Sequence, residues 1–145
     1  MTAQSHRVVA ATRGWLGTPY HDQASLKGVG CDCLGLIRGV WRETIGPEPF
    51  AMPPYSRDWG EIAQREPILD LARTVMAEVP VDQRAPGTVL VFRMRAGALA
   101  KHLGILTEPA RFIHAYERLG VLEEPLSAAW QRRLVAAFQF PEPTG

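Results

Sequence analysis

The first half of the chain carries apolar residues at the spacing of amphipathic helices. Residues 5–16, 32–44 and 67–78 each repeat apolar positions three and four residues apart, which predicts three helices. The start signals are Ser5, Asp32 and Pro67, and the end signals of the first two helices are Gly17 and the pair Gly46-Pro47. The expected buried residues are Val8, Ala11, Trp15 and Leu16 in the first helix and Leu36, Ile37, Val40 and Trp41 in the second.

The second half of the chain changes to the pattern of strands. Five segments rich in Val, Ile, Leu and Phe predict strands at residues 88–92, 102–106, 111–116, 121–123 and 134–140. Helices followed by strands favour an α+β fold in which an antiparallel sheet packs against the early helices. No internal repeat or domain boundary interrupts the pattern, so we expect one domain over residues 1–145.

Composition and charge exclude several classes of protein. The 145 residues are 46% hydrophobic and 21% charged, which is ordinary for a globular domain, and the formal net charge is +1. We therefore expect no binding to nucleic acid or to an anionic membrane, and no run of 18 apolar residues predicts a membrane span. The first seven residues do not resemble a secretory signal, so we expect the protein in the cytoplasm unless another particle carries it out.

The two cysteines lie where a glycine-containing loop meets the second predicted helix. Cys31 and Cys33 are too close in sequence for an unstrained disulfide, so we expect reduced thiols. Cys33 falls on the first turn of the helix, where unpaired N–H groups and a partial positive charge favour the thiolate. We therefore expect a lowered pKa and a nucleophilic role for Cys33, and a structural role for Cys31.

Two histidines lie on a predicted hairpin far from Cys33 in the sequence. If the hairpin is symmetric about Glu108, His102 and His114 are directly opposite each other and point to the same face. His102 would act as the general base for Cys33, and His114 would fix the orientation of the His102 ring. Gly104, on the same face, would leave room for a helix end or a substrate to approach.

Two more residues are candidates for the substrate and oxyanion site. The backbone N–H of Cys33 is one donor to the oxyanion of a tetrahedral intermediate, and Tyr20 is the candidate for the second donor. Asp32 is the candidate N-cap of the helix and is placed in the same site. Two acidic residues further along the chain, Glu123 and Glu124, are expected to be solvated.

A zinc site is the alternative use of the same thiols and imidazoles. Two cysteines and two histidines could form a Cys₂His₂ site from Cys31, Cys33, His102 and His114. A Cys-x-Cys pair is tighter than the usual spacing of two to four residues, and no second spaced pair exists. We therefore favour the nucleophile and expect no metal or other cofactor.

Four motifs, in this order, resemble those of the NlpC-type cell-wall cysteine peptidases. They are Leu16-Gly17-Thr18-Pro19-Tyr20, Gly30-Cys31-Asp32-Cys33-Leu34-Gly35-Leu36, Lys101-His102-Leu103-Gly104-Ile105-Leu106 and Phe112-Ile113-His114-Ala115. The resemblance implies a papain-like α+β fold and cleavage of the peptide stems of bacterial peptidoglycan, typically between D-glutamate and the diamino acid. It matches Cys33, His102 and His114 to the nucleophile, the base and the orienting residue. It also matches Tyr20 to a tyrosine beside the nucleophile.

Several features depart from most members of that family. Leu34 stands where many members have serine, Cys31 is an added thiol, and residues 47–85 form an insert that begins with a proline-rich segment. These features are similar to a branch encoded with the tail genes of bacteriophages and gene-transfer agents. This branch implies a phage-like tail or baseplate as partner, which would deliver the enzyme to the cell wall in the periplasm.

Two other functions stay open on the sequence. One alternative to the peptidase is a structural tail-tip or adaptor module of the same fold, and the other is an amidase or acyltransferase of the same superfamily. The complete set of Cys33, His102 and His114 argues against a purely structural module. No residue distinguishes water from an amine as the acceptor of an acyl group.

Overall fold

A computed structural model describes residues 1–49 and 66–144 of the chain. Four α-helices, one short 3₁₀ helix and eight strands are present in these residues. The helices are α1 (Ala3–Arg13), α2 (Cys33–Thr44), α3 (Pro67–Val75) and α4 (Ala128–Arg133), with the 3₁₀ turn η1 at Val81–Gln83. The strands are β1 (Ser25–Leu26), β2 (Gly30–Cys31), β3 (Ala77–Val79), β4 (Val89–Arg93), β5 (Ala100–Glu108), β6 (Arg111–Tyr116), β7 (Gly120–Pro125) and β8 (Leu134–Gln139).

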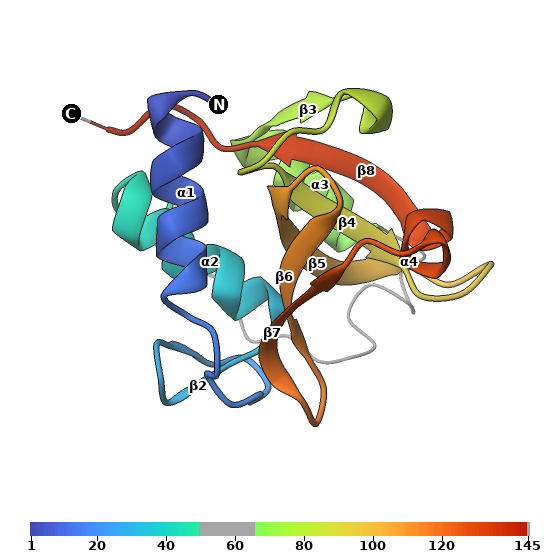
Figure 1. Ribbon diagram of the computed structural model, residues 1–145, viewed down its shortest axis with the longest axis horizontal. Helices are drawn as coiled ribbons and strands as arrows, with labels where there is room; N and C mark the ends of the chain where they lie inside the picture. The colour runs from blue at the N-terminus through green and yellow to red at the C-terminus, as the bar shows by residue number, and fades with distance from the viewer. Residues whose placement is uncertain (50–65, 145) are drawn as a thin grey trace.

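Six of the strands form one antiparallel sheet in the order β3-β8-β4-β5-β6-β7. The short strands β1 and β2 pair separately in the loop that leads into α2. Figure 1 shows α1 and α2 together on one side of the sheet. Helix α4 lies at the start of β8, at the end of that strand away from α1. The expected α+β fold with an antiparallel sheet is therefore confirmed.

The sheet buries both of its faces. Residues at alternate positions of the strands pack against α1, α2 and α3 in the larger core; from the sheet these are Val89, Val91, Leu103, Ile105, Ile113, Ala115, Val121, Ala136 and Phe138. The intervening positions pack under α4 in a second core made of Leu90, Phe92, Leu106, Phe112, Leu126, Trp130 and Ala137. This alternation is the period-two pattern of a strand with a buried group on each side.

Helix α2 begins as the sequence predicts, because Asp32 caps it. A carboxylate oxygen of Asp32 accepts a hydrogen bond from the backbone N–H of Gly35 at 2.7 Å. Two glycines let this helix approach its neighbours closely. A Cβ atom at Gly39 would lie 2.0 Å from the Trp15 ring, and one at Gly35 would lie 1.8 Å from the carbonyl oxygen of Ala24.

We expect the substitution Gly35→Ala to destabilise the protein by about 3 kcal/mol or more, despite the better helix propensity of alanine. The added methyl group would meet the rigid Ala24 backbone rather than a flexible side chain. Urea denaturation measures this change. Gly14→Ala is the matched control, because its nearest side-chain neighbour is the flexible end of Lys27 at 3.1 Å. Equal stability of the two variants would contradict this prediction.

The ends of the predicted helices differ from those observed. Helix α1 begins at Ala3 because Thr2, not Ser5, is the N-cap, and it ends at Arg13, so Leu16 is exposed. Helix α3 ends at Val75 rather than at residue 78 because the following residues form β3, which pairs with β8. The loop that leads into α2 contains the short strands β1 and β2, and neither these strands nor α4 was predicted.

The proline-rich part of the predicted insert, residues 50–59, lies outside the described residues. The described end of the insert contributes α3 and β3, and α3 packs into the larger core. Within residues 1–49 and 66–144, no helix has both the length and the apolar character needed to cross a bilayer.

Candidate active site

The thiol of Cys33 lies at the first residue of α2, as the sequence predicts. Cys33 is partly buried, and its thiol donates a hydrogen bond to the carbonyl oxygen of Lys101 on β5, at 3.5 Å. Lys101 directly precedes His102 in the chain. The start of α2 therefore contacts the strand that carries the candidate base, across 68 residues of sequence.

The backbone pairing between strands β5 and β6 ends beside this contact. Their ladder ends at the pair Ile105 and Ile113, and in the described structure the residues beyond it pair only with β4 or β7. The predicted register is wrong by two residues, because Leu106 pairs with Phe112 and the loop is shorter than symmetry about Glu108 requires. A shift of two preserves the face on which each side chain lies.

The two histidines contact each other as predicted, although they are diagonal neighbours rather than opposite partners. His102 Nε2 lies 2.7 Å from His114 Nδ1, and the ring planes are nearly perpendicular at 84°. Gly104 makes this contact possible, but not by admitting a helix or a substrate. A Cβ atom there would come within 2.9 Å of the Phe112 ring and 3.3 Å of His114 Cβ, so the missing side chain gives space to β6.

Glu124 extends this pair, and the sequence analysis missed it. His114 is completely buried, and its Nε2 lies 2.6 Å from a carboxylate oxygen of Glu124. The second oxygen of Glu124 accepts a hydrogen bond from the indole N–H of Trp130 at 3.2 Å. The expectation that Glu124 is solvated is therefore wrong. The signal that could have found it is its position on β7, on the same face as His114.

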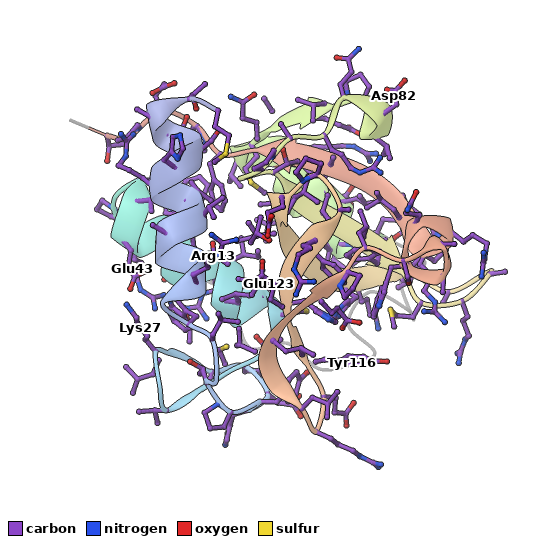
Figure 2. All side chains as sticks on the ribbon, in the orientation of Figure 1. Arg13, Lys27, Glu43, Asp82, Tyr116 and Glu123 are labelled. Atoms are coloured by element: carbon purple, nitrogen blue, oxygen red, sulfur yellow. The ribbon has the colours of Figure 1, made fainter. Side chains whose placement is uncertain are left out.

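Glu123 is also far from fully solvated, but it faces the other way. It accepts a hydrogen bond from the Thr107 hydroxyl at 2.5 Å and pairs with Arg13 of α1 at 3.3 Å. Figure 2 shows Arg13 and Glu123 close together between α1 and the sheet. The two neighbouring glutamates thus serve opposite faces of β7.

Aromatic rings enclose the two histidines. The indole of Trp130 stacks against the His102 ring with a centroid distance of 5.7 Å, and the Tyr116 ring lies 5.8 Å from His102 and 5.2 Å from His114. Figure 2 shows Tyr116 on the side of the sheet away from α1. Among the described residues, Nδ1 of His102 has no hydrogen-bond partner, so this nitrogen is available to a thiol or a substrate.

The model of the NlpC/P60 family matches residues 17–139, which contain Cys33, His102, His114 and Glu124. The chain belongs to the NlpC/P60 family. A search of the curated proteins found no match.

Solved structures of other NlpC/P60 proteins share the fold. The NlpC/p60 domain of the peptidoglycan hydrolase SagA superposes with a TM-score of 0.67 at 20% identity, covering 94% of this chain and 98% of that domain. An NLP/P60 protein from Staphylococcus aureus, described as similar to lipoprotein, superposes with a TM-score of 0.63 at 21% identity, covering 96% of this chain and 42% of that one. NlpC2 from Trichomonas vaginalis superposes with a TM-score of 0.65 at 15% identity, covering 97% of this chain and 48% of that one. This chain therefore spans less than half the length of the last two structures. The family match and the superpositions confirm the papain-like NlpC/P60 fold.

The electrostatics of this NlpC/P60 site differ from the expected thiolate–imidazolium pair. Burial, with a smaller effect from the nearby charge of Asp32, raises the pKa of the Cys33 thiol to about 12, against the opposing hydrogen bonds of backbone N–H groups of Leu103 on β5 and of Leu34 and Cys33 at the helix start. Burial also lowers the pKa of His102 to about 3, helped by His114. The prediction of a lowered cysteine pKa is wrong, because desolvation exceeds the helix-end effect. The favoured resting state is a neutral thiol and a neutral imidazole.

Tyr20 and Asp32 lie on the loop that precedes the nucleophile. Tyr20 forms an isolated bridge with Cys31, and the backbone N–H of Cys31 donates to Pro19. Burial, the charge of Cys33 and other nearby acidic groups raise the pKa of Tyr20, so its hydroxyl remains a donor at neutral pH. Asp32 accepts backbone hydrogen bonds from Gln23 and Gly35, both at 2.7 Å. The roles of Tyr20 and Asp32 toward a substrate stay predictions.

Cys31 lies in the core and not in the site. It is completely buried, and burial raises the pKa of its thiol to about 12. In the described part of the chain, no group of three or more His, Cys, Asp or Glu side chains is arranged to hold a metal ion.

We expect the low pKa of His102 to make stability depend on pH. An unfolded histidine binds a proton below about pH 6.5, but folded His102 resists protonation down to about pH 3. Its contribution is therefore present above pH 6.5 and is lost as the pH falls, by about 1.4 kcal/mol per unit. Between pH 7 and 5 the protein should lose about 2 kcal/mol more stability than the variant His102→Gln, measured by urea denaturation. Equal losses in the two proteins would contradict this.

Proposed function

We propose that this chain is a cysteine endopeptidase that hydrolyses the peptide stems of bacterial peptidoglycan. The single observation that carries the proposal is the thiol of Cys33 at the start of α2, in contact with the strand that presents the His102–His114 pair. Membership of the NlpC/P60 family and the likeness to the SagA peptidoglycan hydrolase domain support the substrate class.

The reaction divides into two acyl-transfer steps. His102 takes the thiol proton on Nδ1 while the sulfur of Cys33 forms a bond to the substrate carbonyl carbon. The resulting tetrahedral intermediate collapses, its C–N bond breaks, and the leaving amine takes the proton from His102, which leaves a thioester on Cys33. Water then attacks the thioester as His102 accepts its proton, and the carboxylic acid product and the free thiol are released.

The neutral resting pair fits this sequence of proton transfers. A thiol held neutral by burial must lose its proton at the moment of attack, and an imidazole with a low pKa is unprotonated over the whole physiological range. The first turn of α2 supplies N–H groups to the oxyanion, a contribution of about 3 kcal/mol per donor in other enzymes. We propose the hydroxyl of Tyr20 as the second donor, because Tyr20 forms a bridge with Cys31, which lies two residues before Cys33 in the chain.

The proposed scissile bond is the one between D-glutamate and the diamino acid. Support comes from the four ordered motifs that resemble the NlpC-type peptidases. Incubation of the protein with purified muropeptides, followed by mass spectrometry, tests the activity and the bond together. The expected product pair is a stem shortened to D-glutamate and the released diamino-acid fragment, absent with Cys33→Ala. Intact muropeptides would contradict the proposal, and products with a new amide in the presence of added amines would indicate an acyltransferase.

We further propose that a phage-like tail carries the enzyme to the cell wall in the periplasm. The added Cys31, Leu34 and the insert over residues 47–85 support this, since they are similar to the tail-encoded branch of the family. Mass spectrometry of purified particles from the producing cells should detect the chain in stoichiometric amounts with tail proteins. Its presence only in the soluble cell fraction would contradict delivery by a particle.

A further inference from the structure

The carboxylate of Glu124 makes the two-histidine contact directional. Glu124 receives the indole N–H of Trp130 on one oxygen and contacts His114 Nε2 on the other at 2.6 Å. A carboxylate can only accept hydrogen bonds, so His114 must carry its proton on Nε2. Neutral His114 then has a bare Nδ1, which is an acceptor.

The same reasoning fixes the proton of His102. Because His114 Nδ1 accepts, His102 must donate from Nε2 across the 2.7 Å contact. The other nitrogen of neutral His102, Nδ1, then carries a lone pair. This is the nitrogen that has no hydrogen-bond partner among the described residues. The lone pair therefore lies on the nitrogen that can act as a base, on the residue that follows the thiol's hydrogen-bond partner Lys101 in the chain.

We propose that Glu124 is a positioning residue of this active site, which sets the tautomers of both histidines and stabilises the charge that His102 gains when it takes a proton. The proposal rests on the proposed function for the transfer of the Cys33 proton to His102 and for the identity of the substrate, whereas the contacts among Glu124, His114 and His102 are present in the structure itself. Glu124 does not contact the reacting atoms; it acts through His114.

Burial strengthens this relay. His114 is completely buried and the side chain of Glu124 is only 28% exposed, so water does not compete freely for their hydrogen bond. Two other charged or titratable groups lie near the histidines: Tyr116 on β6 contacts both rings, and Arg133 lies over the Trp130 ring at 5.3 Å. Among these groups, none accepts a hydrogen bond from His114 Nε2 in the described structure. The orientation of the relay therefore depends on Glu124.

The first test reads the tautomers in the unmodified protein. Nitrogen-15 NMR of the histidine rings at pH 7 should show protons on Nε2 of both His102 and His114, and bare Nδ1 atoms. A proton on Nδ1 of His102 in the folded protein would overturn the proposal. This measurement needs no substrate and no variant. It therefore tests the proposal even if the variant Glu124→Gln, used in the second test, does not fold.

The second test removes the charge of Glu124 and follows the reactivity of Cys33. In Glu124→Gln, the rate of alkylation of Cys33 by iodoacetamide at pH 7 should fall about tenfold, and its pH profile should move to higher pH, because the imidazolium form of His102 is less stabilised. Peptide mapping distinguishes Cys33 from Cys31. With muropeptides, kcat should fall by about 10- to 100-fold while KM changes less than twofold.

Glu123→Gln is the matched control, because it removes the same charge from the adjacent residue on the other face of β7. Its alkylation profile should match that of the unmodified protein, and equal shifts in both variants would overturn the proposal. Alkylation and cleavage separate the two hypotheses. A shifted profile without cleavage of muropeptides would leave the relay standing and reject the peptidase, whereas cleavage with an unshifted profile would do the reverse.

Discussion

Replacement of Cys33 by alanine is expected to abolish the cleavage of muropeptides, with a loss of about 10⁴-fold or more. In the proposed mechanism the sulfur of Cys33 is the atom that becomes acylated, and the other thiol of the chain cannot substitute for it because Cys31 is completely buried. The fold should survive, since Cys33 is only partly buried, alanine favours helices, and the thiol makes a single weak hydrogen bond. Activity assays on muropeptides, combined with thermal unfolding, measure both effects.

Cys31→Ala is the control for this experiment. Its side chain packs in the larger core, so its loss should lower the stability by about 1–2 kcal/mol and leave the rate of cleavage within about threefold. The opposite pattern, with cleavage retained in Cys33→Ala and lost in Cys31→Ala, would mean that the nucleophile has been misassigned.

Replacement of His102 by alanine is expected to lower kcat by about 10³-fold with little effect on KM. The variant loses the base that must take the proton of a thiol whose pKa burial raises to about 12. The space left beside Trp130 and His114 suits a small heterocycle, so added imidazole should restore part of the activity. Steady-state kinetics with and without imidazole measure this prediction.

His6→Ala serves as the control for this second variant. His6 is exposed on α1 and has no place in the site, so the variant should cleave at the normal rate and should not respond to imidazole. A decrease in kcat of less than about tenfold in His102→Ala would show that His102 is not the base.

Local signals in the sequence were sufficient to locate the main parts of the site. Asp32 as a cap places Cys33 on the first turn of α2 because a short polar side chain can accept the free N–H groups of that turn. The alternation along β5 and β6 places His102 and His114 on one face, and an error of two residues in the register does not change this result. Each of these predictions depends on residues that are neighbours in the sequence or share one hairpin.

Contacts between distant segments could not be predicted in the same way. Helix α4 is only six residues long, and the pattern of six residues is too short to indicate which element Trp130 covers. Glu124 looked like half of a solvated acidic pair because the sequence does not show that β7 extends through it beside His114. Strand β3 replaces the last turn of the third predicted helix because its residues pair with β8, and this distant pairing overrides the local helical pattern.

The sequence by itself therefore determined the position of Cys33 at the start of a helix, the shared face of the two histidines and the α+β order of elements, because capping and periodicity are properties of short segments. Only the tertiary structure decided the rest. It set where the pairing of β5 with β6 ends, placed the Glu124 carboxylate beside His114, and favoured the neutral forms of Cys33 and His102. These depend on which groups are removed from water together, and desolvation is a property of the packed molecule rather than of any stretch of chain.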